Sequence, residues 1–191
     1  SNVENVFGSD FNDTLFGDAN DNLIQGEEGA DVIAGGAGAD ELFGGSGNDT
    51  ITGGLGIDLV VGGAGDDTFL ITSGNDLLTG GTFIGEAGDD TLSTNQTSLD
   101  LTAPNLEINT IETIKSTNAG AATFVLDQGV FSDLQFANAA ITLQSTGTGG
   151  SIQLNGAGTF DFAALTGVTL TNLPNIVAGD VNGAGVADSN V

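Results

Sequence analysis

Residues 7–69 repeat a pattern of hydrophobic and polar positions with a period of nine. A large apolar residue follows an acidic or amide residue by two positions in every unit. The apolar column comprises Leu15, Ile24, Ile33, Leu42, Ile51, Val60, Phe69 and Leu78. Nine residues make about two and a half turns of an α-helix, so a helix would place this column on alternating faces. The glycine pairs also disfavour a helix.

The pattern instead predicts short β-strands joined by glycine turns. We expect strands of three residues, such as residues 50–52 with Ile51 pointing inward, and six-residue turns, such as residues 44–49. Two successive units then form one coil with a strand on each side. Coils stack at the strand-pairing distance of about 4.8 Å, and the inward residues of both sides form a thin core. Several coils must stack, because one coil cannot bury its own apolar residues.

Four consecutive units carry the complete string GGxGxDxUx, in which U is large and apolar: GGAGADEL, GGSGNDTI, GGLGIDLV and GGAGDDTF. This string is similar to the calcium-binding nonapeptide of RTX (hemolysin-type) proteins, and the likeness covers roughly residues 5–92. The resemblance implies an all-β fold, a right-handed parallel β-roll that binds calcium. The early units depart from the pattern, because Asn22 replaces the acid and the first three units have one glycine where two are expected.

Acids and glycine turns together can supply the six to eight oxygens that a hard divalent cation prefers. The predicted ligand side chains are Asp13, Asn22, Asp31, Asp40, Asp49, Asp58, Asp67, Asp76 and Asp90. The predicted turn glycines, which curl the backbone so that its carbonyls face the ion, are Gly26, Gly35, Gly36, Gly38, Gly44, Gly45, Gly47, Gly53, Gly54, Gly56, Gly62, Gly63 and Gly65. Acids separated by two repeat units lie on the same edge of the roll. The pairs 13/31, 31/49, 49/67, 22/40, 40/58 and 58/76 then give inter-turn sites for about four to six Ca²⁺ ions.

The charge and composition of the chain exclude several classes of partner and of metal site. The 191 residues carry a formal net charge of -25, with Lys115 as the only basic residue. Nucleic acid and anionic membrane surfaces are excluded as partners, since both need a basic surface. No cysteine or histidine is present, which excludes ordinary zinc, haem and iron–sulfur sites and a thiol nucleophile. No apolar run is long enough for a membrane-spanning helix.

The composition changes near residues 93–99, so we divide the chain into a calcium-binding roll (1–92), a β-rich partner region (93–178) and an acidic C-terminal tail (179–191). The partner region contains short alternating runs such as SIQL and VTLT, which indicate a less regular solenoid or a sandwich. No glycine- or proline-rich linker marks the boundary, so the halves could be stacked parts of one body. If they fold independently, removal of calcium should spare residues 97–177.

We expect a non-enzymatic calcium-binding structural and binding module of a secreted bacterial surface protein that folds when calcium binds. The resemblance implies export through a type I secretion channel, an extracellular or cell-surface location, and contacts with the surface or with other copies. It extends weakly to S-layer proteins and adhesins. Two alternatives stay open: an accessory module of a larger secreted enzyme such as a protease, lipase or epimerase, and a carbohydrate- or surface-binding lattice module. Asp127, Asp133 and Asp161 could in principle act as paired carboxylates, but no spacing singles them out.

Overall fold

The computed structural model describes residues 4–72, 80–102, 105–119, 123–127, 142–145, 151–155, 169–171 and 175–178. Every regular element within these ranges is a β-strand, as the sequence predicts. No helix in the described ranges could cross a membrane. Asp76, Leu78, Asp133, Asp161 and the predicted tail at 179–191 lie outside the described residues.

The strands follow one another at short intervals along the chain. Those of the repeat region are β1 (Asn5–Phe7), β2 (Thr14–Phe16), β3 (Leu23–Glu28), β4 (Val32–Ala37), β5 (Glu41–Ser46), β6 (Thr50–Leu55), β7 (Leu59–Ala64), β8 (Thr68–Ile71), β9 (Gly81–Ala87) and β10 (Thr91–Thr94). Those that follow are β11 (Ser98–Asp100), β12 (Leu106–Asn109), β13 (Thr113–Ser116), β14 (Thr123–Asp127), β15 (Thr142–Ser145), β16 (Ser151–Asn155), β17 (Thr169–Thr171) and β18 (Asn175–Ala178).

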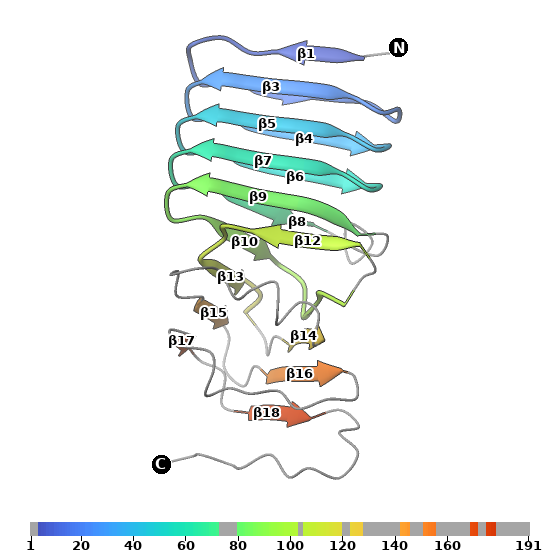
Figure 1. Cartoon of the computed structure of the whole chain (residues 1–191), viewed down its shortest axis with the longest axis vertical. Coiled ribbons are helices and arrows are strands. Elements are labelled where there is room, and N and C mark those ends of the chain that lie inside the picture. The colour runs from blue at the N-terminus through green and yellow to red at the C-terminus, as the bar shows by residue number, and fades with distance from the viewer. Residues whose placement is uncertain are drawn as a thin grey trace.

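From β1 to β10, successive strands alternate between two stacked parallel sheets (Figure 1). The first sheet has the order β1-β3-β5-β7-β9-β12, and the second has the order β17-β15-β13-β10-β8-β6-β4-β2. Paired residues in the regular coils are two repeat units apart, as in Thr50 with Thr68. This is the predicted parallel β-roll, with one strand of each coil in each sheet.

The predicted apolar column forms the core between the sheets. The described core includes Ile24, Ile33, Leu42, Ile51, Val60, Phe69, Phe83, Leu92, Ile108 and Ile114, each at most 4% exposed. Burying one such side chain contributes about 1.5–3 kcal/mol, and each regular coil adds only one from each sheet. The stability of the roll therefore depends on the number of stacked coils.

One interruption shifts the register of both sheets. Leu59 pairs with Thr82 and Thr68 pairs with Thr91, so each of these steps is longer than the regular step from Thr50 to Thr68. The residue in register with Val60 is Phe83, not the predicted Leu78. Phe69 and Phe83 meet edge to face across the core, with ring centroids 6.1 Å apart and planes at 83°. The core column thus resumes after the extra residues with a large aromatic pair.

The strands are longer than predicted. From β3 to β7 each strand has six residues and includes the first three positions of the predicted six-residue turn. The pairing of Gly36 with Gly54 and of Ala37 with Leu55 shows why: the ladder between coils continues through these positions. The turn between β6 and β7 is therefore residues 56–58, half the predicted length. A glycine turn that stacks on identical turns keeps its backbone hydrogen bonds.

The second half continues the solenoid, so the sandwich alternative is wrong for the described strands. β10 crosses the compositional boundary and pairs in parallel with β8 on one side and β13 on the other. The second sheet then continues through β15 and β17, while a third parallel sheet has the order β11-β14-β16-β18 (Figure 1). Coil length varies here, since the step from Thr113 to its partner Thr142 is longer than the step from Thr91 to Thr113.

Candidate metal centre

A ladder of carboxylates runs along the edge of the roll that leads into the second sheet. The backbone N–H of each acid donates to Oδ1 of the acid one coil later, as Asp31 does to Asp49 and Asp49 does to Asp67, both at 2.8 Å. The same bond joins Asp13 to Asp31 and Asp67 to Asp90, also at 2.8 Å. The interruption in the repeat does not break this ladder, because the strands beside it keep a common register. The pair 67/90, which the sequence prediction did not include, therefore belongs to the ladder.

The opposite edge carries a shorter ladder. Asn22 N–H donates to Asp40 Oδ1 at 2.8 Å, and Asp40 N–H donates to Asp58 Oδ1 at 3.0 Å. Thr82 N–H bonds to Asp58 O, as Thr68 N–H bonds to Asp49 O on the first edge. Gly81 consequently occupies the place after Asp58 where the sequence prediction put Asp76. Asp76 itself lies outside the described residues, so the pair 58/76 stays a prediction.

Five of these acids have a buried oxygen without a hydrogen-bond partner. The atoms are Oδ2 of Asp31, Asp40, Asp49, Asp67 and Asp90, and the five residues are at most 1% exposed. Burial of a charged oxygen is strongly unfavourable unless it is paired or coordinates a cation. These acids occupy equivalent positions in successive coils, and a row of bound cations would explain all five oxygens at once.

A glycine opens the space beside each of these oxygens. A methyl group on Gly35 would collide with Asp40 Oδ2 and lie 2.7 Å from the carbonyl oxygen of Gly53 in the next coil. The first glycines of the other predicted turns, Gly26, Gly44, Gly53 and Gly62, likewise lie against the acid of their own turn. At Gly26 and Gly44, as at Gly35, the carbonyl of the next coil is also adjacent. The space beside the glycine is thus bordered by a carboxylate oxygen of its own turn and by a backbone carbonyl oxygen of the next coil.

The remaining predicted glycines lie in the same turns, with positive φ angles. They are Gly36, Gly38, Gly45, Gly47, Gly54, Gly56, Gly63 and Gly65. Two of the units with a single glycine keep this backbone shape, because Glu27 (φ 79°) and Glu86 (φ 77°) adopt the left-handed conformation at the second glycine position. The turn is therefore a property of the stacked coil and does not need glycine at every place.

The pKa values of four ladder acids are raised by burial. Burial raises the pKa of Asp67 to about 7, with further contributions from the charges of Asp49 and Asp90, against a lowering by the backbone hydrogen bond. The pKa values of Asp40 and Asp90 rise to about 6, again mainly through burial, and that of Asp49 is raised for the same reason. Burial thus makes these carboxyl groups harder to ionise than an exposed aspartate.

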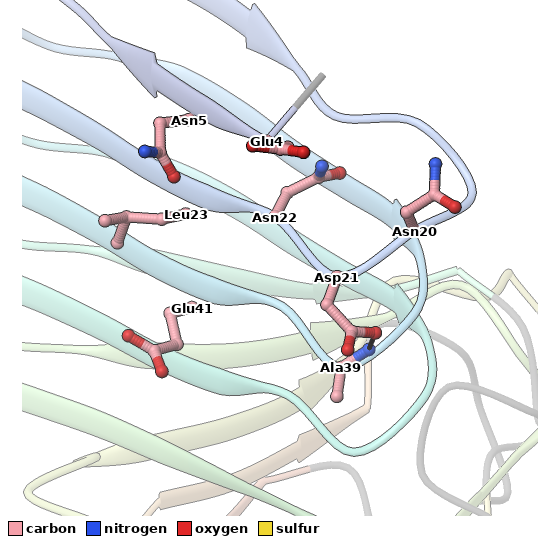
Figure 2. Close-up of a pocket in the computed structure, with 8 residues that line it drawn as sticks. All are labelled: Glu4, Asn5, Asn20, Asp21, Asn22, Leu23, Ala39 and Glu41. Atoms are coloured by element: carbon pink, nitrogen blue, oxygen red, sulfur yellow. Dashed lines mark hydrogen bonds between the residues drawn. The ribbon is translucent and has the colours of Figure 1, made fainter. Parts of the chain in front are cut away.

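The first two turns differ from the others. Ser9 donates from both its N–H (2.7 Å) and its Oγ (2.8 Å) to Asp13 Oδ2. Asn22 Oδ1 accepts from Asp18 N–H at 2.8 Å. Figure 2 shows Asn22 in a hollow with Glu4, Asp21 and Glu41, where Asp21 Oδ1 accepts from Ala39 N–H at 2.8 Å. In both turns the side-chain oxygen is hydrogen-bonded within its own turn, whereas the equivalent oxygen of the later turns has no partner. This difference agrees with the departure of the two turns from the motif.

Glu112 is the ladder member that sequence reasoning missed. Asp90 N–H donates to Glu112 Oε2 at 2.8 Å, so Glu112 takes the position after Asp90. A signal was present, since Glu112 precedes the buried Ile114 by two residues, as each repeat acid precedes its apolar residue. The missing glycine turn and the longer side chain concealed it.

The side-chain atoms along both ladders that could bind a metal ion are oxygens. No group of three or more His, Cys, Asp or Glu side chains gathers among the described residues, so backbone carbonyls must complete any coordination shell. Carboxylate and carbonyl oxygens are the ligands of hard cations, Ca²⁺ above all, and do not suit softer metals. The residues present therefore fit calcium.

Comparison with known proteins agrees with this chemistry. The family described as "RTX calcium-binding nonapeptide repeat (4 copies)" matches residues 7–42, 43–78 and 72–96. No match was found among the curated proteins or among the solved structures. RTX nonapeptide repeats form a structural module that binds Ca²⁺.

Proposed function

We propose that this chain is an extracellular structural module whose β-roll folds when calcium binds, because residues 7–96 match the RTX calcium-binding nonapeptide repeat family. The observation that carries the proposal is the row of five buried carboxylate oxygens without a partner. Calcium neutralises these groups when bound, which removes the main electrostatic obstacle to stacking the coils. Metal binding then contributes directly to the folding free energy.

The ions are assigned to the spaces between successive turns. On the longer edge the side chains that hold them are Asp31, Asp49, Asp67 and Asp90, each with carbonyl groups of the adjoining turns. On the shorter edge they are Asp40 and Asp58. Asp13 and Asn22 form weaker sites at the N-terminal end, because hydrogen bonds from Ser9 and Asp18 already occupy their oxygens.

The setting of the module is a secreted bacterial protein. RTX repeat proteins are typically secreted, and a metal-dependent fold suits export, since the chain stays unfolded at low calcium and folds outside. We assign export to a type I secretion channel and the location to the cell surface, with contacts to the surface or to other copies. The same roll would serve equally as an accessory module of a secreted enzyme, and no catalytic role is assigned to this chain.

The substitution Asp49→Asn tests the assignment of the ions. Asp49 bonds to the coil before it through Oδ1, and its Oδ2 lies at the space that faces the coil after it. The asparagine keeps an acceptor for Asp31 N–H but lacks the charge, so two adjacent sites in the middle of the stack weaken. We expect the calcium midpoint of β-structure, followed by circular dichroism, to rise about tenfold or more.

Asp13→Asn is the matched control, because Asp13 stands at the end of the ladder and its Oδ2 is already hydrogen-bonded. Coils of a solenoid touch only their neighbours, so this variant should fray one end and shift the midpoint little. Equal shifts for the two variants would show that the acids do not bridge successive turns. A wild-type chain that neither binds calcium nor gains β-structure at millimolar calcium would contradict the proposed function itself.

Acidification should weaken calcium binding in a defined window. The pKa values of Asp67 (about 7), Asp40 and Asp90 (about 6) are raised in the metal-free roll, so the folded form holds protons more tightly than the unfolded chain. The metal-free roll is thus most stable below the unfolded pKa and loses that stability as the pH rises through 6 to 7. Calcium must displace these protons at low pH. We expect the calcium midpoint to rise as the pH falls from about 7.5 to about 5.5. Between about pH 8 and pH 9, where the groups are ionised, it should stay constant. A calcium midpoint that did not change with pH would show that these acids are not ligands of the ions.

A further inference from the structure

The carboxylate ladder continues past the last nonapeptide. Asp90 is fully buried, and its Oδ2 has no hydrogen-bond partner. A methyl group on Gly85 would collide with both Asp90 Oδ2 and the carbonyl oxygen of Thr110. Asp90 therefore faces the same kind of space as the acids of the complete repeats, but the opposite wall comes from a segment without the motif.

Thr110 supplies that wall in place of a glycine turn. Its backbone is left-handed (φ 51°), which is uncommon for a threonine. Its Oγ1 accepts from Glu86 N–H at 2.8 Å and donates to Asn109 O at 2.8 Å. These two bonds hold the turn against the last repeat, with the Thr110 carbonyl directed at Gly85.

Glu112 supplies the acid. Its Oε2 accepts from Asp90 N–H at 2.8 Å, the bond that Asp Oδ1 makes between coils of the repeats. In return, the N–H groups of Glu112 and Thr113 donate to Asp90 O at 3.1 and 3.0 Å. A half-buried acid is thus held next to a fully buried one, whose second oxygen is unpaired.

We propose that Asp90, Glu112 and the carbonyl of Thr110 form a further calcium site at the junction between the roll and the strands that follow it. The site rests on the calcium function proposed above, but its second wall lies outside the matched residues 7–96. It explains why two acids lie side by side where the glycine turns have ended. An ion bound there would add a calcium-dependent link to the backbone pairing that already joins β12 and β13 to the repeat region.

Glu112→Gln tests the site in the full chain. The glutamine keeps an acceptor for Asp90 N–H and so preserves the ladder bond, while the charge is lost. We expect equilibrium dialysis with elemental analysis to find one bound calcium ion fewer than in the wild type. Amide exchange of Thr113–Ser116 should slow on calcium addition in the wild type and much less in the variant.

Glu107→Gln is the control, since Glu107 is an exposed acid on β12 of the first sheet, where it pairs with Thr82, whereas Asp90 and Glu112 lie at the edge that leads into the second sheet. It should bind as many ions as the wild type. Equal stoichiometry in all three proteins, or an equal loss in both variants, would overturn the junction site while leaving the repeat sites intact. Absence of calcium from the wild type would instead contradict the proposed function.

Discussion

Removal of calcium is expected to abolish the parallel β-structure between Asn5 and Ile71. Successive ladder acids are one strand spacing apart, about 4.8 Å. Unscreened carboxylates at that distance repel by about 3 kcal/mol per pair at an effective dielectric of about 20. Several such terms rival the whole stability of a domain, about 5–15 kcal/mol. Circular dichroism with excess chelator should show loss of β-structure, and excess calcium should restore it. An unchanged spectrum would mean that the roll is stable without metal.

The loss should extend beyond the repeats. β12 pairs with β9, and β13 pairs with β10, so these strands lose a neighbour when the roll unfolds. The sequence alone suggested that residues 97–177 could be spared. The continuous sheets instead favour loss of protection in at least β12 and β13, which limited proteolysis with and without chelator would detect. Resistance of these strands to proteolysis in chelator would show that the second half folds by itself.

Gly54→Ala should destabilise the calcium-loaded roll strongly. Gly54 has a φ of 106°, and a methyl group there would collide with the carbonyl oxygen of Gly36 in the coil before it. Because that obstacle is backbone, it cannot rotate away. The strained backbone alone costs about 1–3 kcal/mol, and crowding in a packed stack adds a similar amount. Thermal unfolding at saturating calcium should show the loss as a clear drop in Tm.

Leu55→Ala is the matched control for this substitution. Leu55 is the next residue along β6 and is 49% exposed, so its truncation should change the Tm little. Glu27 (φ 79°) and Glu86 (φ 77°) show that a side chain fits the equivalent position at a smaller φ. If Gly54→Ala matched the wild type, the backbone at this turn would be free to move to such an angle.

The core and ladder of the regular coils could be predicted from the sequence because both depend on a fixed spacing. An equal number of residues per coil places Ile33 under Ile51 and Asp31 beside Asp49. The prediction became wrong where the coil length changed. Counting in nines led to Leu78, whereas the core column resumes at Phe83. The spacing of residues along the chain does not show where a longer coil rejoins the stack, since that depends on packing between coils.

Strand length was underestimated for a related reason. Glycine pairs are typical of turns, and in isolation they disfavour a strand. In β6 the second glycine has a positive φ and still pairs with Gly36 of the coil before it. Identical turns stacked on one another satisfy each other's backbone groups, which is a property of the neighbours and not of the local sequence.

All the ladder bonds point in the same direction along the roll. Each acid accepts from the backbone of the coil before it, as Asp49 does from Asp31 and Asp67 from Asp49. A coil exposed at the N-terminal side therefore offers a carboxylate oxygen, which water solvates readily. A coil exposed at the C-terminal side offers a backbone N–H group that lacks the carboxylate of a following coil as its acceptor. The acid ladder is thus polar, with two unlike ends, and each of its N–H groups is satisfied by the coil that follows it in the chain. A neighbouring row of bonds runs the other way, since Asp66 N–H donates to Asn48 Oδ1 and Asp89 N–H donates to Asp66 Oδ1.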